Sequence, residues 1–128
     1  MTNVLEGIRV IEQGTFITGP AASMLLADLG AEVIKVERPG SGDPFRAFKG
    51  GLYSPHFQTY NRNKKSVALN LREESGRKVL KDLVEVSDCV VENLRPGVID
   101  RMGLGYDQLK KINPRLIYAA ISGFGRLE

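Results

Sequence analysis

Two arginines carry the clearest chemical signal in this sequence. Arg38 and Arg72 each follow an apolar run rich in β-branched residues, at points where a strand is expected to end. The planar guanidinium group presents a fork of N–H donors that suits phosphate oxygens better than a solvated lysine does. A single arginine is more often an ordinary surface charge, so a binding site requires that the fold bring the two together.

Two other reactive residue types occur once each. His56 is the only histidine, so a metal site built on several imidazoles or a Ser-His-Asp triad would have to centre on it, whereas its neighbours Pro55 and Phe57 favour packing. Cys89, the only cysteine, cannot form an intrachain disulfide and lies in an apolar run, where a thiol is more often a small buried hydrophobe than a nucleophile. We assign neither residue to catalysis and expect no metal site.

The first glycines bear on dinucleotide binding. An apolar run, Gly14, a helical stretch and a second run ending at Glu37 resemble a dinucleotide-binding unit, in which the acidic residue binds a ribose hydroxyl. Four residues separate Gly14 from Gly19, and Phe16 and Ile17 fill the turn, so the GxGxxG fingerprint is absent. NAD binding is therefore a minor alternative.

Two polar segments fit a ligand contact and a simple turn about equally well. The run 61–65 (NRNKK) could bind phosphate or nucleic acid, or could form a turn that leads into a strand. The segment 92–97 (ENLRPG) is typical of a strand end followed by a turn, in which Asn93 can bond to a ligand or to its own backbone. Both alternatives stay open for each segment.

The elements that must position these residues alternate between strand and helix. The expected strands are 8–11, 33–36, 66–71, 89–91 and 116–121. Runs such as VIKV, CVV and LIYAAI are apolar on both faces, as in a parallel sheet covered by helices. Right-handed crossovers with a reversal after the first strand predict an α/β fold, a Rossmann-like open parallel sheet of about five strands in the order 3-2-1-4-5 with helices on both faces.

The sequence predicts three helices from their start and stop signals. The first helix contains AASMLLADL. It is expected to begin at Gly19-Pro20, where proline fixes φ, and to end at Gly30, because glycine readily adopts the left-handed conformation that ends a helix. The second is expected over about 73–86 and the third over about 106–112. Between Pro39 and Lys65 the residues have no clear period, and a loop of that length is usually functional or ordered by a partner.

One edge of the predicted sheet gathers the candidate residues. Parallel strands bring their carboxyl ends to the same edge, where open α/β folds bind ligands. The residues expected there are Gln13–Thr18, Arg38, Arg72, Asn93–Pro96 and Ser122–Gly125. Arg38 and Arg72 then lie at neighbouring strand ends.

Composition agrees with a single domain. The chain of 128 residues and 14.1 kDa is 42% hydrophobic and 26% charged, which excludes collagen-like, disordered and disulfide-scaffold proteins. A net charge of +3 and a pI near 9.1 are too weakly basic for a DNA-binding stripe and fit an anionic small ligand. The start MTNVLEGIRV is unlike a signal peptide and no apolar run is long enough to span a membrane, so we expect a cytoplasmic protein without nucleic-acid or membrane partners.

Four segments carry a family resemblance along the whole chain. They are LEGIRVIEQGTFITGPAASMLLADLGAEVIKVERPGSGDP, NRNKKSVALNL, VVENLRPGVIDRMGLGYDQL and NPRLIYAAISGFG. In order and spacing they resemble the class III CoA-transferases, the CaiB/BaiF family, to which formyl-CoA transferase, carnitine CoA-transferase and α-methylacyl-CoA racemase belong. The resemblance implies an open α/β fold taken from an interlocked homodimer, and an enzyme that moves CoA between carboxylic acids.

The resemblance also implies a CoA site. The family's CoA-contacting positions match Ile17, Thr18, Arg38, Leu69, Asn70, Leu71, Arg72, Asn93, Leu94, Arg95, Arg101 and Met102. Most of them lie near the predicted strand ends, whereas Arg101 and Met102 come from the resemblance alone. The implied substrates are an acyl-CoA and a carboxylic acid acceptor, with no tightly bound cofactor.

Catalysis in the family depends on an aspartate that attacks the acyl-CoA thioester. That aspartate lies beyond the SGFG segment, and no aspartate of this chain matches it. Family members are much longer, so we expect residues 1–126 to be the N-terminal part of the large CoA-binding domain. We expect this part to be inactive by itself. We expect Leu127-Glu128 to be a tag junction. The alternatives are an acyl-CoA racemase or epimerase of the same family, and a non-catalytic nucleotide-binding module.

Overall fold

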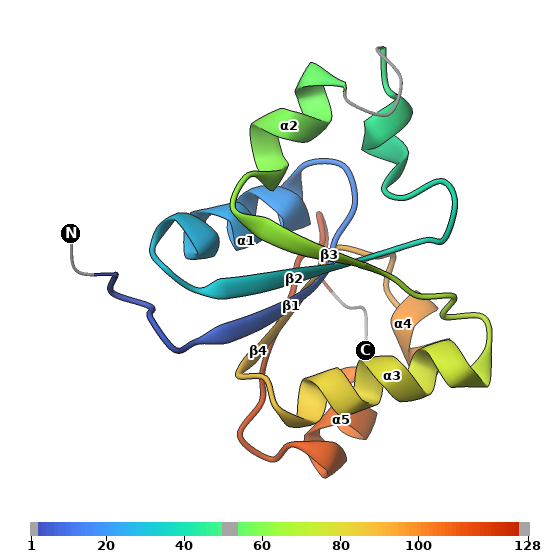
Figure 1. Cartoon of the computed structure of the whole chain (residues 1–128). Coiled ribbons are helices and arrows are strands. Elements are labelled where there is room, and N and C mark those ends of the chain that lie inside the picture. Colours follow the sequence, from blue (N-terminus) through green and yellow to red (C-terminus); the bar gives the residue numbers. More distant parts are fainter. Residues whose placement is uncertain (1–2, 50–53, 126–128) are drawn as a thin grey trace.

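Five parallel strands form the centre of the computed structural model, which describes residues 3–49 and 54–125 (Figure 1). The strands are β1 (Arg9–Gln13), β2 (Glu32–Glu37), β3 (Lys64–Ala68), β4 (Cys89–Glu92) and β5 (Ile117–Ala120). Their order is β3-β2-β1-β4-β5, and every neighbouring pair is parallel. The predicted strand order and direction are confirmed. Leu127 and Glu128, expected to be a tag junction, lie outside the described residues.

Helices cover both faces of this sheet. They are α1 (Thr18–Asp28), the 3-10 helix η1 (Pro44–Ala47), α2 (Pro55–Asn61), α3 (Glu74–Glu85), α4 (Val98–Arg101) and α5 (Tyr106–Ile112). The helices α1 and α2 lie on one side of the sheet, and α3 and α5 lie on the other (Figure 1). Within residues 3–49 and 54–125, no helix has the length and apolarity needed to cross a bilayer.

The strands are apolar on both faces because each face packs against helices. Val10 of β1 belongs to a buried cluster with Ala27 of α1, whereas the next residue, Ile11, belongs to a cluster with Leu80 and Val84 of α3. Side chains alternate between the two faces of a strand, so one strand contributes to two cores. This arrangement is what the apolar runs predicted.

The third strand ends earlier than predicted. We expected a strand over 66–71, but β3 ends at Ala68 and a turn follows. The cause is Asn70, whose Oδ1 accepts the N–H of Arg72 at 3.2 Å and whose carbonyl oxygen accepts the N–H of Glu73 at 3.1 Å. A side chain that bonds to the backbone two residues ahead competes with the strand ladder. The predicted residues Leu69–Arg72 therefore form a turn before α3.

The segment between Pro39 and Lys65 is more ordered than its composition suggested. Its described part contains η1 and α2, and both begin with the same signal, a capping side chain followed by proline. Asp43 accepts the N–H of Phe45 at 2.9 Å, and Ser54 accepts the N–H of Phe57 at 3.1 Å. Proline is well tolerated in the first turn of a helix, because its missing N–H would have no helical partner there. The helix α4, which was not predicted, follows Gly97 at a φ of +81°.

Candidate functional site

The predicted binding residues gather along the carboxyl edge of the sheet. Ile17 and Thr18 follow β1, Arg38 directly follows β2, and Leu69–Arg72 follow β3. Asn93–Arg95 follow β4, and Arg101 with Met102 closes α4. The side chains of the four arginines in this set are exposed; they are Arg38, Arg72, Arg95 and Arg101. Three of these exposed guanidinium groups, those of Arg38, Arg72 and Arg95, belong to segments that follow strand ends at this edge, where they could bind an anion.

The turn between β1 and α1 is packed too closely for side chains at two positions. A Cβ added to Gly14 would lie 2.9 Å from Cδ of Pro20, and one added to Gly19 would lie 3.0 Å from Oδ1 of Asn93. Both glycines therefore serve the close approach of the turn to α1 and to the end of β4. The two glycines allow this close packing, and they are not part of a GxGxxG dinucleotide-binding fingerprint.

Asn93 bonds to this turn with its whole carboxamide group. Its Oδ1 accepts the N–H of Thr15 at 2.8 Å, while Nδ2 donates to the carbonyl oxygen of Thr15 at 2.8 Å and to Oγ1 of Thr18 at 2.9 Å. The carboxamide of Asn93 thus bonds to the turn after β1 and not to its own backbone, which was one of the two alternatives given for it. Both N–H donors of its side chain are thereby used.

A cavity of about 310 Å³ lies beside Asn93, at the ends of β1, β4 and β5. Its lining residues are Thr18, Asn93, Leu94, Arg95, Pro96, Ile121, Ser122 and Gly123. The cavity brings together the predicted residues that follow β1, β4 and β5. It does not include Arg38, the turn 69–72, Arg101 or Met102.

Part of the predicted set is engaged in packing. Leu69, Leu71, Leu94 and Met102 are partly buried and lie against the apolar cluster that contains Ile99. These side chains therefore join the strand-end turns and α4 to the core beneath α3 and α5. The exposed arginines of these segments, Arg72, Arg95 and Arg101, therefore lie next to residues that pack against the core.

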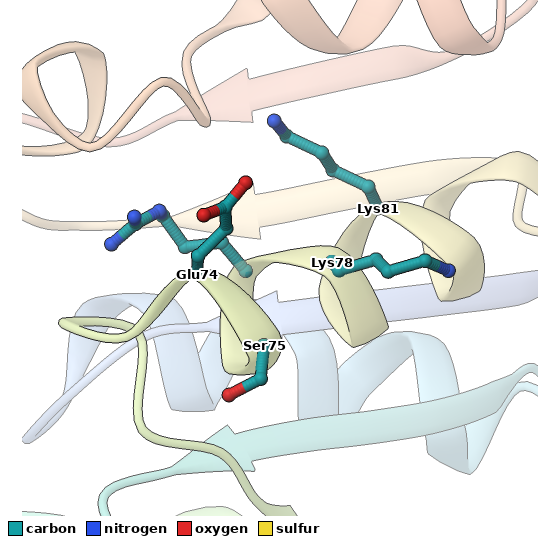
Figure 2. Close-up of a pocket in the computed structure, with 5 residues that line it drawn as sticks. Glu74, Ser75, Lys78 and Lys81 are labelled. Carbon is teal, nitrogen blue, oxygen red and sulfur yellow. The ribbon is translucent and has the colours of Figure 1, made fainter.

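A second and larger hollow, of about 540 Å³, lies on the solvent side of α3 (Figure 2). Glu74, Ser75, Arg77, Lys78 and Lys81 line it. Arg77 donates to the carbonyl oxygens of Leu71 and Arg72, at 3.1 and 2.8 Å, and Lys78 pairs with Asp82 at 2.7 Å. All of its lining residues come from one helix, so it is a shallow surface feature and not a site assembled by the fold.

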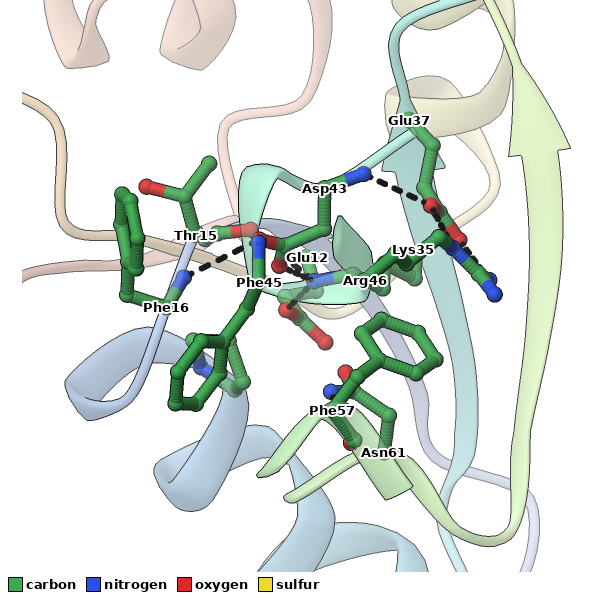
Figure 3. A network of polar contacts seen from close by, with 12 residues as sticks. Glu12, Thr15, Phe16, Lys35, Glu37, Asp43, Phe45, Arg46, Phe57 and Asn61 are labelled. Atoms are coloured by element: carbon green, nitrogen blue, oxygen red, sulfur yellow. Dashed lines mark hydrogen bonds and ion pairs between the residues drawn. The ribbon is translucent and has the colours of Figure 1, made fainter. Parts of the chain in front are cut away.

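A buried cluster of charges lies directly behind the carboxyl edge (Figure 3). Nζ of Lys35 lies 2.7 Å from Oε1 of Glu12 and 2.8 Å from Oδ2 of Asp43, and all three side chains are almost fully buried. Nζ of Lys64 lies 2.7 Å from Oε2 of Glu12, which also accepts the hydroxyl of Ser23 at 2.6 Å. We did not predict this cluster, although charged residues inside the apolar strands RVIEQ and EVIKVE were a signal that partners must exist.

Glu37 extends the cluster toward the loop after β2. Arg46 donates to both of its carboxylate oxygens at 2.7 Å, and Ser66 and the N–H of Asp43 donate at 2.9 Å. Burial by itself raises the pKa of Glu37, but these hydrogen bonds, the Arg46 bonds above all, outweigh burial and lower the pKa from 4.5 to about 2. The carboxylate that a dinucleotide unit would offer to a ribose is thus committed to protein donors, which removes the observation that suggested NAD.

The remaining reactive residues are not part of a catalytic group. The exposed His56 stacks on Phe45, with ring centroids 5.6 Å apart, and meets Phe48 edge-on at 5.1 Å. Cys89 is half-buried against the cluster that contains Val10, and burial raises the pKa of its thiol. Within the described ranges no group of three or more His, Cys, Asp or Glu side chains could hold a metal ion.

Gln13 is the unexplained residue of this edge. It is the last residue of β1 and is 5% exposed, yet neither Nε2 nor Oε1 has a hydrogen-bond partner among the described residues. Buried amides are nearly always hydrogen-bonded. The last residue of β1 therefore has a buried donor and a buried acceptor without hydrogen-bond partners among the described residues.

The comparison with known families is decisive for identity, because the model of CoA-transferase family III matches residues 5–127. The chain belongs to CoA-transferase family III. Succinyl-CoA:glutarate CoA-transferase of Homo sapiens is 45% identical to this family III chain, over 98% of the chain and 30% of that protein. Acetyl-CoA:oxalate CoA-transferase of Acetobacter aceti is 46% identical, over 94% of the chain and 32% of that protein.

Solved structures agree with this family III assignment. A CaiB/BaiF family protein from Brucella suis superimposes with a TM-score of 0.90 and 40% identity, covering 97% of this chain and 34% of that protein. The chain spans about 30% of the length of the curated relatives that it matches. The resemblance inferred from the four sequence segments is confirmed, as is the α/β fold that it implied.

Proposed function

We propose that this chain is the N-terminal, CoA-binding part of a class III CoA-transferase, which moves CoA between carboxylic acids. In this proposal Arg38 and Arg72 hold the anionic nucleotide end of CoA. The other proposed CoA contacts are Ile17, Thr18, Leu69–Leu71, Asn93–Arg95, Arg101 and Met102. We further propose that the whole protein is a cytoplasmic homodimer.

The observation that carries this proposal is the row of arginines along the carboxyl edge. Arg38 and Arg72 follow the neighbouring parallel strands β2 and β3, whose last residues, Glu37 and Ala68, are partners in register. Both side chains are exposed. Ligands of open α/β sheets bind at this edge, and CoA carries several phosphate oxygens that charge-assisted hydrogen bonds can hold.

The relatives named as CoA-transferases support a transfer reaction, and we propose that this reaction passes through an aspartyl intermediate. In that reaction a carboxylate oxygen attacks the thioester carbonyl, the CoA thiolate leaves, and a mixed anhydride forms. The thiolate then attacks the aspartyl carbonyl, which releases the first acid and leaves an aspartyl-CoA thioester. The acceptor carboxylate attacks that thioester in turn, which releases the CoA thiolate and forms a second mixed anhydride. The thiolate then attacks the acceptor carbonyl of this anhydride, which forms the new acyl-CoA and frees the aspartate carboxylate.

The aspartates of this chain are poorly placed for that role. Asp28 bonds to Arg62 at 2.6 Å at the end of α1, and Asp43 is 3% exposed and pairs with Lys35. Asp100 lies in α4. None of the six aspartates in the sequence follows β5, so we propose that the nucleophile lies in a part of the enzyme outside this chain.

The proposal is tested by calorimetric titration of CoA into the intact protein that carries this chain. Arg38→Ala should weaken CoA affinity by about ten- to hundredfold, because one charge-assisted hydrogen bond contributes about 1.5–3 kcal/mol. Arg115→Ala is the matched control, since Arg115 is exposed but precedes β5 at the opposite edge. Equal CoA affinity of Arg38→Ala and the wild type would remove Arg38 from the site.

A further inference from the structure

The turn between β1 and α1 contains a residue in a strained backbone conformation. Phe16 has a φ of +59°, in the left-handed region that side chains other than glycine rarely adopt. Such a conformation persists only where surrounding contacts impose it. The turn leads directly to Ile17 and Thr18, so these contacts also determine where those two residues lie.

The contacts come from both neighbouring strands. On the β4 side, Asn93 bonds to Thr15 and Thr18. On the β2 side, Nζ of Lys35 donates to the carbonyl oxygen of Gly14 at 3.0 Å, and Oδ1 of Asp43 accepts the N–H of Phe16 at 3.2 Å. Of these contacts, the bond to Asp43 acts on the strained peptide unit itself (Figure 3).

Asp43 is itself fixed from several directions. Its N–H donates to Oε2 of Glu37 at 2.9 Å, its Oδ1 also accepts the N–H of Phe45 at 2.9 Å, and its Oδ2 lies 2.8 Å from Nζ of Lys35. The residue is 3% exposed, so water does not compete for these bonds. Asp43 belongs to the same loop as Arg38, and it therefore joins that loop to the turn after β1.

We propose that Asp43 is a positioning residue that holds Phe16 in its left-handed conformation and thereby fixes Ile17 and Thr18 relative to Arg38. This inference rests on the proposed function, because those three residues are its proposed CoA contacts. Asp43 acts on CoA binding through the turn and touches no ligand itself. Its removal should loosen the turn and weaken CoA binding while the rest of the sheet stays folded.

The test combines hydrogen–deuterium exchange with CoA titration on the intact protein that carries this chain. Asp43→Ala deprives the Phe16 N–H of its acceptor, so amide exchange in a peptide covering 14–18 should rise at least about tenfold, and the Kd for CoA should rise about tenfold. Exchange in α5 should rise by less than exchange over 14–18, because α5 reports only the global loss of stability. Asp43→Asn keeps an oxygen for the Phe16 N–H but loses the charge that faces Lys35, so it should give the same changes at a smaller size, about threefold.

Val84→Ala is the control for a purely structural effect. Val84 is fully buried against the other face of the sheet, so this variant should be destabilised while its CoA affinity and its exchange over 14–18 stay at wild-type values. Unchanged exchange over 14–18 in Asp43→Ala would overturn the proposal, as would increased exchange with unchanged CoA affinity. If Asp43→Ala fails to fold, Asp43→Asn takes its place: unchanged exchange over 14–18, or increased exchange with unchanged CoA affinity, would again overturn the proposal. Failure of the wild type to bind CoA would instead overturn the proposed function, and the exchange data would still show whether Asp43 orders the turn.

Discussion

Replacing Gln13 by leucine should stabilise this chain, although it changes a central strand. The side chain is 5% exposed, and both its carboxamide nitrogen and its oxygen lack partners among the described residues. A buried polar group without a hydrogen bond costs about 1–3 kcal/mol, whereas leucine has a similar volume and needs no partner. Gln13→Leu should therefore raise the free energy of unfolding of the 128-residue chain by about 1–3 kcal/mol.

The measurement is urea unfolding followed by circular dichroism, supported by thermal unfolding. An increase of about 1 kcal/mol should raise Tm by roughly 4 °C in a chain of this size. Gln108→Leu is the control, because Gln108 is exposed on α5 and its replacement should change the free energy of unfolding by less than about 0.5 kcal/mol. A Gln13→Leu variant less stable than the wild type by more than about 1 kcal/mol would show that the amide has a stabilising partner, and would refute the reasoning.

Three further predictions concern charge and catalysis. Folding lowers the pKa of Glu37 from 4.5 to about 2, so ionised Glu37 should contribute on the order of 3 kcal/mol to the free energy of unfolding. This contribution is complete above pH 4.5 and is lost as the pH falls toward 2. The free energy of unfolding should therefore decrease with falling pH over this range, and it should decrease less steeply in Glu37→Gln. Lys35→Met leaves Glu12 and Asp43 without their shared cation, so the free energy of unfolding measured by urea denaturation should fall by about 3–5 kcal/mol. The control Lys110→Met breaks an exposed ion pair and should lower the same free energy by less than about 1 kcal/mol. The 128-residue chain alone should exchange no CoA between acyl-CoA donors and carboxylic acids, and exchange that disappears on substitution of one of its own carboxylates would contradict this.

The strand order was predictable because it depends on local patterns and general rules. Runs that are apolar on both faces require helices on both sides, and right-handed crossovers then leave few orders to choose from. The helix α5, observed at Tyr106–Ile112, matches its predicted range because Asn113-Pro114 ends it. Gly30, with a φ of +103°, likewise follows the end of α1 as a left-handed residue.

The interior of the candidate site was less predictable because its contacts join residues far apart in the sequence. The pairing of Glu12 with Lys35 and Asp43 depends on the register of two strands and on the path of a loop, neither of which leaves a periodic pattern. The role of Asn93 depends on a turn 78 residues away. The helix α2 was missed because its only signals, Ser54 and Pro55, lie inside a segment without a period.

The buried charges behind the carboxyl edge also constrain how this sequence can evolve. Glu12, Lys35, Asp43 and Lys64 share contacts, so a single substitution that removes one charge leaves its neighbours buried and uncompensated. A lineage can leave this arrangement only by passing through a destabilised intermediate or by changing several positions together. Among descendants of a common ancestor these four positions should consequently be inherited as a block, retained jointly or replaced jointly by apolar side chains.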